Sequence, residues 1–402
     1  MRLKTPVRLR RGLTMAAAGT VVLGFAGFAV AQGGPASADP HQVYTIVGSD
    51  TIQDVYNQFS LDEGANLIGS WNATNPSNLT LINEDITPNN AAGGQCSFSR
   101  PNGSGQGESA LRKSINQSTT AAQLAIAPGA NCIDWSRSSS GPGTDQKADG
   151  QLVFIPFAID AVTGAVGSES STAFQTETNL LTTAQLTTLY NTCTNVTMPD
   201  GTVLDPNGTG NGTTILNIDL YLPQSGSGTA KFWASKTGGY SLSPPPACDH
   251  QTIVNATNPA NDGTVVEEHD GSAVSDDPNG YGPFSIAQYI AQSTGFGINR
   301  IHNAILVDIN SIAPEVNGSL NLNASFTREV YDIIPFNNVT SGMTGFNAQE
   351  AQLLAGTSSV LCRDVITITN YGFALLPSNS ATYDACGATT ANLRAFDSTD
   401  PV

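Results

Sequence analysis

The stretch Asp219-Leu-Tyr-Leu-Pro-Gln-Ser-Gly-Ser-Gly-Thr-Ala-Lys-Phe-Trp-Ala-Ser235 contains three consecutive elements that decide the fold. Apolar residues over 215–222 predict a β-strand, which Pro223 ends because proline has no N–H to donate to a sheet. The small residues 225–229 form a loop, and the following residues are expected to open a helix. The first N–H groups of a helix lack internal partners, and the helix dipole adds positive charge there. The stretch therefore predicts an anion-binding loop.

Two further segments have the same arrangement. Gly48-Ser-Asp-Thr51 follows a predicted strand over 43–47, and Asn102-Gly-Ser-Gly-Gln-Gly-Glu-Ser109 leads into another helix. A single loop of this kind is equally typical of a tight turn with an ordinary Ser or Thr helix cap, and Thr51 is placed to cap its helix. Three loops favour convergence on a small oxyanion. The candidate ligand contacts are Ser49, Asp50, Thr51, Ser104, Gly105, Ser227, Gly228 and Thr229.

Residues 1–38 are interpreted as a secretory signal peptide. A basic start is followed by an uncharged apolar run, and Ala36-Ser-Ala38 matches a cleavage signal. Arg10-Arg11 is a twin-arginine pair with poor flanks, which leaves Sec and Tat export both open. The cleavage site has no nearby cysteine for a lipid anchor, and no later run is apolar enough to insert in a membrane. We expect a secreted protein.

The mature chain is strongly acidic. The signal peptide carries five of the 16 Lys and Arg residues and none of the 33 Asp and Glu residues, so 11 basic residues remain and the net charge is −22. Such a surface repels nucleic acids and anionic membranes. An anionic ligand must therefore be held by local donors and dipoles.

Six cysteines in an oxidising compartment predict three disulfides. Six cysteines allow 15 pairings, and sequential pairing is favoured here because each neighbouring pair falls within one segment of a predicted lobe. The predicted pairs are Cys96 with Cys132, Cys193 with Cys248, and Cys362 with Cys386. A metal site is the weaker interpretation, because the chain has no C-x-x-C motif and few histidines.

Strands alternate with helices along the chain, which predicts an α/β architecture. Ile155-Pro-Phe157 is repeated as Ile334-Pro-Phe336 at the end of a second strong strand, and the repeat suggests two strands that cross between lobes. The predicted lobe I comprises residues 39–157 and 331–402, and the predicted lobe II comprises residues 158–330.

Five motifs occur in the order found in one protein family: Gly48-Ser-Asp-Thr51, Gly103-Ser-Gly-Gln-Gly107, Ile133-Asp-Trp-Ser-Arg-Ser-Ser139, Ser227-Gly-Thr229 and Tyr371-Gly-Phe-Ala-Leu-Leu-Pro377. In these motifs the chain resembles the PstS-like phosphate-binding proteins of the type 2 periplasmic solute-binding superfamily. The resemblance implies a two-lobed fold that closes on phosphate, and an ABC permease as partner. It also adds Arg137, Ser138 and Ser139 to the candidate ligand contacts.

Two positions depart from the family pattern. Pro223 stands where the family has an arginine, and Ser139 stands where it has an aspartate that accepts a proton from phosphate and so rejects sulfate. Arg137 is a candidate substitute for the cation, with a surface salt bridge as its alternative role. Asp50 is a candidate proton acceptor, and its alternative role is to cap its own loop. If Asp50 faces the cleft, Asp50→Asn is expected to narrow the preference for phosphate over sulfate.

Binding is favoured over catalysis. The chain has neither a G-x-S-x-G nor an H-E-x-x-H motif, so we predict no enzyme activity, cofactor or metal. Glu267-Glu-His-Asp270 is interpreted as a solvated acidic loop in preference to a cation site. The expected protein is a secreted monomer that captures phosphate or a similar oxyanion for an ABC importer. The alternative is a secreted enzyme or cell-surface protein that reuses the same fold.

Overall fold

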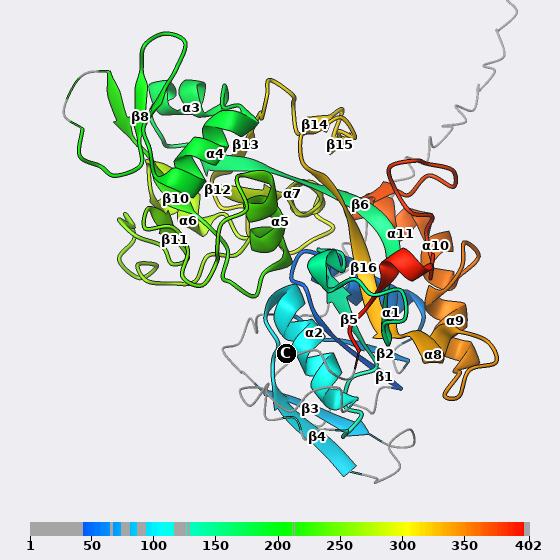
Figure 1. The fold of residues 1–402 in the computed structure, drawn as a ribbon. Helices are drawn as coiled ribbons and strands as arrows, with labels where there is room; N and C mark the ends of the chain where they lie inside the picture. Colours follow the sequence, from blue (N-terminus) through cyan, green and yellow to red (C-terminus); the bar gives the residue numbers. More distant parts are fainter. Residues whose placement is uncertain are drawn as a thin grey trace, which may run out of the picture.

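The computed structural model describes residues 43–64, 67–73, 81–86, 94–115, 126, 129–210, 212 and 214–397. The predicted signal peptide and its cleavage site lie outside these residues. The described chain forms two α/β lobes that are joined by long strands (Figure 1), which confirms the predicted fold class. Among the helices of the described part, none is both long and apolar enough to cross a bilayer.

Lobe I is built on the strand order β2-β1-β5-β16-β6. β1 is parallel to both of its neighbours, whereas β16 runs antiparallel to β5 and β6. The short β17 and β18 add to the outer side of β6. The strands are β1 (Tyr44–Gly48), β2 (Ile68–Ser70), β5 (Trp135–Ser138), β6 (Leu152–Gly167), β16 (Thr327–Pro335), β17 (Ala374–Leu375) and β18 (Arg394–Ala395).

Helices cover this sheet, and a hairpin of β3 (Leu81–Ile86) and β4 (Gly94–Ser99) extends from it. The core between sheet and helices is aromatic and aliphatic, with Trp135 and Phe154 almost fully buried. The helices are α1 (Gln53–Asp62), α2 (Gly103–Ser114), α8 (Phe336–Val339), α9 (Ala348–Leu354), α10 (Val360–Arg363) and α11 (Val365–Asn370), with 3₁₀ turns η2 (Gly143–Asp145) and η3 (Ala391–Leu393).

Lobe II uses the C-terminal end of β6 as one strand of a second sheet. There β6 pairs with β12 and β13, and β10 joins β12 to β11. The elements are β10 (Asp219–Tyr221), β11 (Asp249–His250), β12 (Gly280–Ser285), β13 (Ala304–Val307), α3 (Thr172–Thr178), α4 (Thr183–Thr192), α5 (Gly228–Lys236), α6 (Ser272–Asp276) and α7 (Ile286–Ser293). Two small sheets comprise β7 (Val196–Thr197), β8 (Val203–Asp205) and β9 (Ile215–Asn217), and β14 (Glu315–Val316) and β15 (Ser319–Leu320).

The stretch that opened the sequence analysis folds as predicted in its loop and helix, but not in its strand. The predicted strand over 215–222 is wrong, because β9 and β10 are separate strands in different sheets. The chain changes partner after Ile218, whose N–H still donates to the carbonyl of Asp205, the last residue of β8. Ser227 caps α5 by accepting hydrogen bonds from the N–H groups of Thr229 and Ala230.

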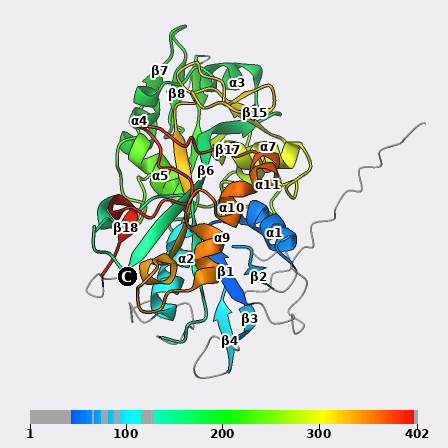
Figure 2. The same ribbon diagram turned by 90° about the vertical axis from the view of Figure 1, so that its right-hand side faces the viewer.

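β6 passes without a break from one lobe to the other (Figures 1 and 2). Ala161 still pairs with β16, whereas Val162 pairs with β12 and also donates to the carbonyl of Phe326 at 2.9 Å. The Ile-Pro-Phe repeats lie in β6 and at the end of β16, away from this crossing. The predicted lobe division at 157/158 and 330/331 stays a prediction.

Three disulfides join Cys96 to Cys132, Cys193 to Cys248 and Cys362 to Cys386. The sequential pairing predicted from the sequence is therefore confirmed. The second bridge ties the end of α4 to the start of β11 in lobe II, and the other two lie within lobe I. No bridge in the described chain crosses the cleft, so covalent bonds leave the lobes free to move relative to each other.

Peptide mapping without reduction is expected to return these three pairs and no thiol that reacts with iodoacetamide. Replacing both Cys193 and Cys248 with Ala is expected to lower the free energy of unfolding by about 2–5 kcal/mol, because the bridge closes a long loop in the unfolded chain. Urea denaturation measures this loss. A disulfide that joins lobe I to lobe II in the map would contradict the expectation.

Candidate functional site

The predicted anion loops of the two lobes meet at one place. β1 and β5 are parallel neighbours, so the segments that follow them leave the same edge of the sheet of lobe I, where α2 also begins. The start of α5 in lobe II faces this edge. Thr51 Oγ1 lies 3.3 Å from Thr229 Oγ1, and Ser104 Oγ lies 3.2 Å from Ser139 Oγ. Residues from four predicted segments are thus brought together.

Gly228 of lobe II packs closely against two serines of lobe I. A Cβ atom on this residue would lie 2.4 Å from Ser104 Oγ and 2.5 Å from Ser139 Oγ. Gly105 lies nearby and donates its N–H to the carbonyl of Gly226 at 2.9 Å. Glycine is therefore required at position 228 for this contact, as the glycine-rich loop in the sequence suggested.

The lobes are in direct contact, so the structure is a closed form. Gln288 of α7 donates to the carbonyl of Thr51 at 2.6 Å, and Asn102 donates to Glu267 Oε1 at 2.7 Å. Ile286 and Ile290 on α7 also pack into the core of lobe I. Polar and apolar contacts together hold α7 and the α5 loop against lobe I.

Glu268 lies at the centre of the hydroxyl groups, and sequence analysis did not identify it as a site residue. Its Oε1 accepts hydrogen bonds from Thr51 Oγ1 at 2.7 Å and Thr229 Oγ1 at 2.9 Å. Its Oε2 accepts one from Ser227 Oγ at 2.9 Å. Burial and the neighbouring charge of Asp50 raise the pKa of Glu268 to about 7. Donors from both lobes therefore already hold a planar, two-oxygen acid group.

The prediction that Thr51 caps the first helix is wrong. α1 begins at Gln53, and its cap residue, Ile52, makes no side-chain hydrogen bond to the helix. The hydroxyl of Thr51 donates to Glu268 instead. A charge-assisted hydrogen bond is about twice as strong as a neutral one, so the tertiary partner is preferred to the local one. The hydroxyl thereby becomes part of the site.

Asp50 also bonds across the cleft and does not cap its own loop. Asp50 Oδ2 lies 3.0 Å from Nδ1 of His269, and both side chains are buried. Although burial opposes both shifts, this contact lowers the pKa of Asp50 and raises the pKa of His269. The alternative of an Asx cap is therefore contradicted. The proposed role of Asp50 in selecting phosphate stays a prediction.

The interpretation of residues 267–270 as a solvated acidic loop is wrong. Glu268 and His269 are 0% and 1% exposed, and Glu267 is only partly exposed. The carbonyl of Glu268 accepts the N–H of Ser285, and the carbonyl of His269 accepts the side-chain amide of Gln292 at 2.8 Å. These two hydrogen bonds hold residues 267–270 against α7, and α7 packs against lobe I at the cleft.

Arg137 is buried and holds the first loop in place. Its Nε donates to the carbonyl of Ser49 at 3.2 Å, and its Nη2 donates to the carbonyl of Trp71 at 2.6 Å. Its Nη1 donates to Ser70 Oγ at 2.9 Å. Arg137 is 0% exposed, so the alternative of a surface salt bridge is contradicted. Its role as a ligand contact stays a prediction, as does that of Ser138, which bonds with Ser140.

Arg328, at the start of β16, was not predicted to belong to the site. Its Nη2 forms an ion pair with Asp160 at 2.8 Å and lies 3.4 Å from Thr51 Oγ1. Its Nη1 is buried and makes no hydrogen bond with the described residues. The sequence signal was weak: an arginine in a strand whose other residues mix polar and apolar types. Arg328 is the cation that reaches the hydroxyl cluster.

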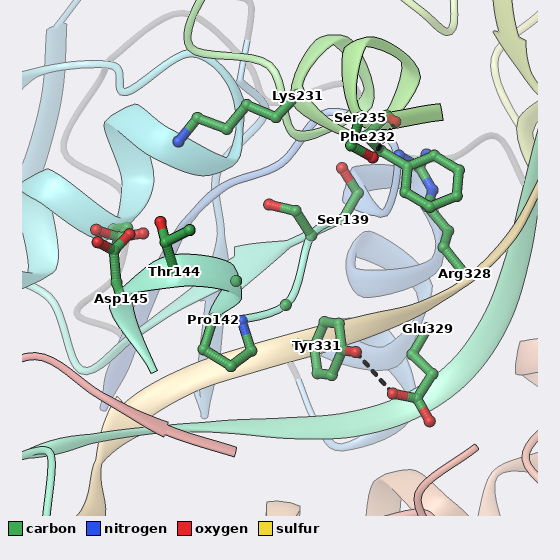
Figure 3. Close-up of a pocket in the computed structure, with 14 residues that line it drawn as sticks. Ser139, Pro142, Thr144, Asp145, Lys231, Phe232, Ser235, Arg328, Glu329 and Tyr331 are labelled. Atoms are coloured by element: carbon green, nitrogen blue, oxygen red, sulfur yellow. Dashed lines mark hydrogen bonds between the residues drawn. The ribbon is translucent and has the colours of Figure 1, made fainter. Parts of the chain in front are cut away.

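A cavity of about 400 Å³ opens beside Ser139, between α5 and the loop that follows β5. Figure 3 shows Lys231 and Phe232 of α5 above this cavity, Tyr331 below it, and Arg328 between Phe232 and Glu329. Lys231 and Arg328 bring positive charge to the walls of the cavity, although acidic residues also line it. The cavity reaches Ser139, whereas Thr51, Ser227 and Thr229 do not line it and are fully buried.

No protein-family model matches the chain, and no curated protein matches it either. Several solved structures resemble it. An ABC-type phosphate transport receptor from Vibrio cholerae is 13% identical with a TM-score of 0.46, and the match covers 83% of this chain and 100% of that chain. A putative phosphate ABC transporter substrate-binding protein with bound phosphate from Clostridium perfringens is 11% identical with a TM-score of 0.45, covering 83% and 99%.

The buried carboxyl of Asp332, beside Arg137, makes the stability of the fold depend on pH. The two residues pair in register between β16 and β5, and both are 0% exposed. Burial raises the pKa of Asp332 to about 8, and the neighbouring Tyr56 and Arg137 oppose this shift. The unfolded value is about 3.9. The folded protein therefore binds this proton more tightly, and the resulting stability is complete below about pH 4 and is lost as the pH rises through 8.

Asp332→Asn is therefore expected to flatten the decline in stability between about pH 4 and pH 8. Urea denaturation at a series of pH values measures the slope. Asp262→Asn, at an exposed position, is the matched control and is expected to leave the slope unchanged. If stability declines with pH equally steeply in wild type and in Asp332→Asn, the raised pKa of Asp332 is contradicted.

Proposed function

We propose that the chain is an extracytoplasmic solute-binding protein that holds phosphate, or a similar oxyanion, between its lobes. The observation that carries this proposal is the set of three hydroxyls, from Thr51, Ser227 and Thr229, that donate to the single carboxylate of Glu268. Hydroxyl donors that converge from two lobes on one acidic group are suited to an oxyanion. The N-terminal end of α5 adds a favourable dipole at the same place.

The ligand is placed beside the Glu268 carboxylate, where it shares the hydroxyl donors that Glu268 holds in the closed form. Because the hydroxyl groups are buried, entry requires the lobes to separate. β6 and the segment that enters β16 are the connections between the lobes, so bending at Ala161–Val162 and near Phe326 would open the cleft. The lobe division at 157/158 and 330/331 belongs to this proposal.

Arg328 supplies the positive charge that an arginine provides in the family at the position occupied here by Pro223. Its buried Nη1 has no hydrogen-bond partner among the described residues, so it has donor capacity left for a ligand. Its other nitrogens are held by Asp160 at 2.8 and 3.1 Å, which fixes the guanidinium beside Thr51. A charge-assisted hydrogen bond from such a group contributes about 1.5–3 kcal/mol.

Glu268 is proposed to distinguish phosphate from sulfate. Near neutral pH phosphate carries at least one proton and sulfate carries none. A carboxylate beside the bound ion accepts a hydrogen bond from phosphate and repels sulfate. Glu268 contacts the hydroxyl cluster directly, whereas Asp50 is paired with His269. Glu268 is therefore better placed than Asp50 for this role.

The cellular role follows from the signal peptide and the fold class. The signal-peptide pattern in residues 1–38 supports export, with cleavage near Ala38. A secreted monomer with a ligand cleft between two lobes is suited to deliver its ligand to an ABC permease. If no anion binds, the alternative of a secreted enzyme or surface protein that reuses the fold is favoured.

Isothermal titration calorimetry of the mature protein with phosphate tests this function. One phosphate per chain is expected to bind. Ser227→Ala is expected to weaken binding by about tenfold or more, because a lost hydrogen bond to a charged group costs about 1.5–3 kcal/mol. Ser227 also caps α5, so Ser171→Ala, which removes the cap of α3, is the matched control and should leave affinity unchanged. Wild-type protein that binds no phosphate, or equal affinity in Ser227→Ala, would sink the proposal.

Titration of Glu268→Gln with phosphate and sulfate at one pH tests selectivity. The ratio of phosphate to sulfate affinity is expected to fall by about tenfold or more, because the neutral amide no longer repels sulfate. Asp50→Asn is the comparison, since the sequence hypothesis assigned selectivity to that residue. A ratio that changes in Asp50→Asn and not in Glu268→Gln would return the role to Asp50.

A further inference from the structure

A second cluster of ligand-type side chains lies beside the hydroxyl cluster and is not used by the proposed anion site. Asp50, Glu267 and His269 each offer one potential metal-ligand atom, and these three atoms lie within 4.8 Å of one another. Asp50 belongs to lobe I, whereas Glu267 and His269 belong to lobe II. Asp50 is 0% exposed and His269 is 1% exposed. The cluster therefore spans the closed cleft and is shielded from water.

Two oxygen atoms of this cluster have no hydrogen-bond partner. Asp50 Oδ1 and Glu267 Oε2 are buried, and neither makes a hydrogen bond with the described residues. Their sister oxygens are engaged: Asp50 Oδ2 by His269, and Glu267 Oε1 by Asn102 at 2.7 Å. Burying these oxygens without a partner is costly, and because the carboxyl groups of Asp50 and Glu267 also approach each other, either a shared proton or a cation would satisfy them.

The distances are compatible with coordination of one ion. Ligand atoms lie about 2.1 Å from a first-row divalent metal, so two ligands of one ion are about 3.0 Å apart at a right angle and about 3.4 Å apart in a tetrahedron. Asp50 Oδ2 and His269 Nδ1 are separated by 3.0 Å. The third ligand atom, from Glu267, lies within 4.8 Å of the other two.

The charges around the cluster also favour a cation. Asp50, Glu267 and Glu268 place three carboxyl groups around a single imidazole. The arginines of this region are engaged elsewhere. Arg328 pairs with Asp160 at 2.8 Å, Arg300 pairs with Asp54 at 3.3 Å, and Arg137 bonds mainly with backbone carbonyls. A divalent ion would offset the excess negative charge.

We propose that Asp50, Glu267 and His269 form a site for a first-row divalent cation of the Mn²⁺ or Zn²⁺ class, which joins lobe I to lobe II. One imidazole with two carboxylates selects this class, because Ca²⁺ and Mg²⁺ prefer ligands that are all oxygen. The ion would add a bond between the lobes, so closure would depend on the cation. The site does not depend on which anion the protein binds.

Calorimetry of the mature, disulfide-bonded protein, stripped with EDTA and titrated with MnCl₂ or ZnCl₂ without any phosphate, tests the site. One ion per chain is expected to bind. Glu267→Gln and His269→Gln are each expected to weaken this binding by about 100-fold, because loss of even an outer partner of a metal ligand costs 10–100-fold. His302→Gln is the matched control. This exposed imidazole lies 3.3 Å from Asp270 outside the cluster, and its loss should leave affinity unchanged.

Thermal unfolding separates loss of the site from loss of the fold. Added Mn²⁺ or Zn²⁺ is expected to raise the Tm of wild type and of His302→Gln, because an ion that binds only the folded state stabilises it. The Tm of Glu267→Gln should match that of ion-free wild type and should not respond to metal. Three results would overturn the proposal: no saturable binding, equal affinity in wild type and Glu267→Gln, or tighter binding of Ca²⁺ than of both probes.

Discussion

The closed cleft depends on the buried ion pair between Asp160 and Arg328, which lies where β6 passes from one lobe to the other. Asp160 accepts two hydrogen bonds from Arg328, one from Ser285 Oγ and one from the N–H of Ala287. It therefore joins β6, β16 and the start of α7 at one carboxylate. α7 in turn holds Glu268 and His269 in the cleft. Removing either Asp160 or Arg328 would leave an uncompensated buried charge. The position of α7, and of the Glu268 and His269 segment that it holds, therefore depends on this ion pair.

The parts of the structure that the sequence predicted are those that local chemistry determines. Ser227 caps its helix because a small hydroxyl residue precedes the first N–H groups, and that logic needs no tertiary partner. The disulfide pairs follow from segments that stay within one lobe. The segments at Ser49 and Ser227 were recognisable because glycine and serine at a strand end favour turns and helix starts. The predicted loop over 102–109 is wrong, because α2 already begins at Gly103 and includes Ser104.

The residues that were missed are placed by contacts between distant segments. Glu268 and Thr51 are 217 positions apart, and Arg328 and Asp160 are 168 apart, so no local pattern connects them. The acidic loop was misinterpreted for the same reason, since adjacent charged residues ordinarily face solvent. Thr51 was assigned to its own helix because the stronger acceptor, Glu268, comes from the other lobe.

The closed form leaves no space for a side chain at position 228. The hydroxyls of Ser104 and Ser139 occupy the space where a side chain would begin at this position. One added methyl group would act as a wedge between the lobes while leaving each lobe intact, because Gly228 lies on the surface at which they meet. A single added methyl group at this position would therefore oppose closure of the lobes. Contact between the two lobes thus depends on steric fit at Gly228 as well as on charge.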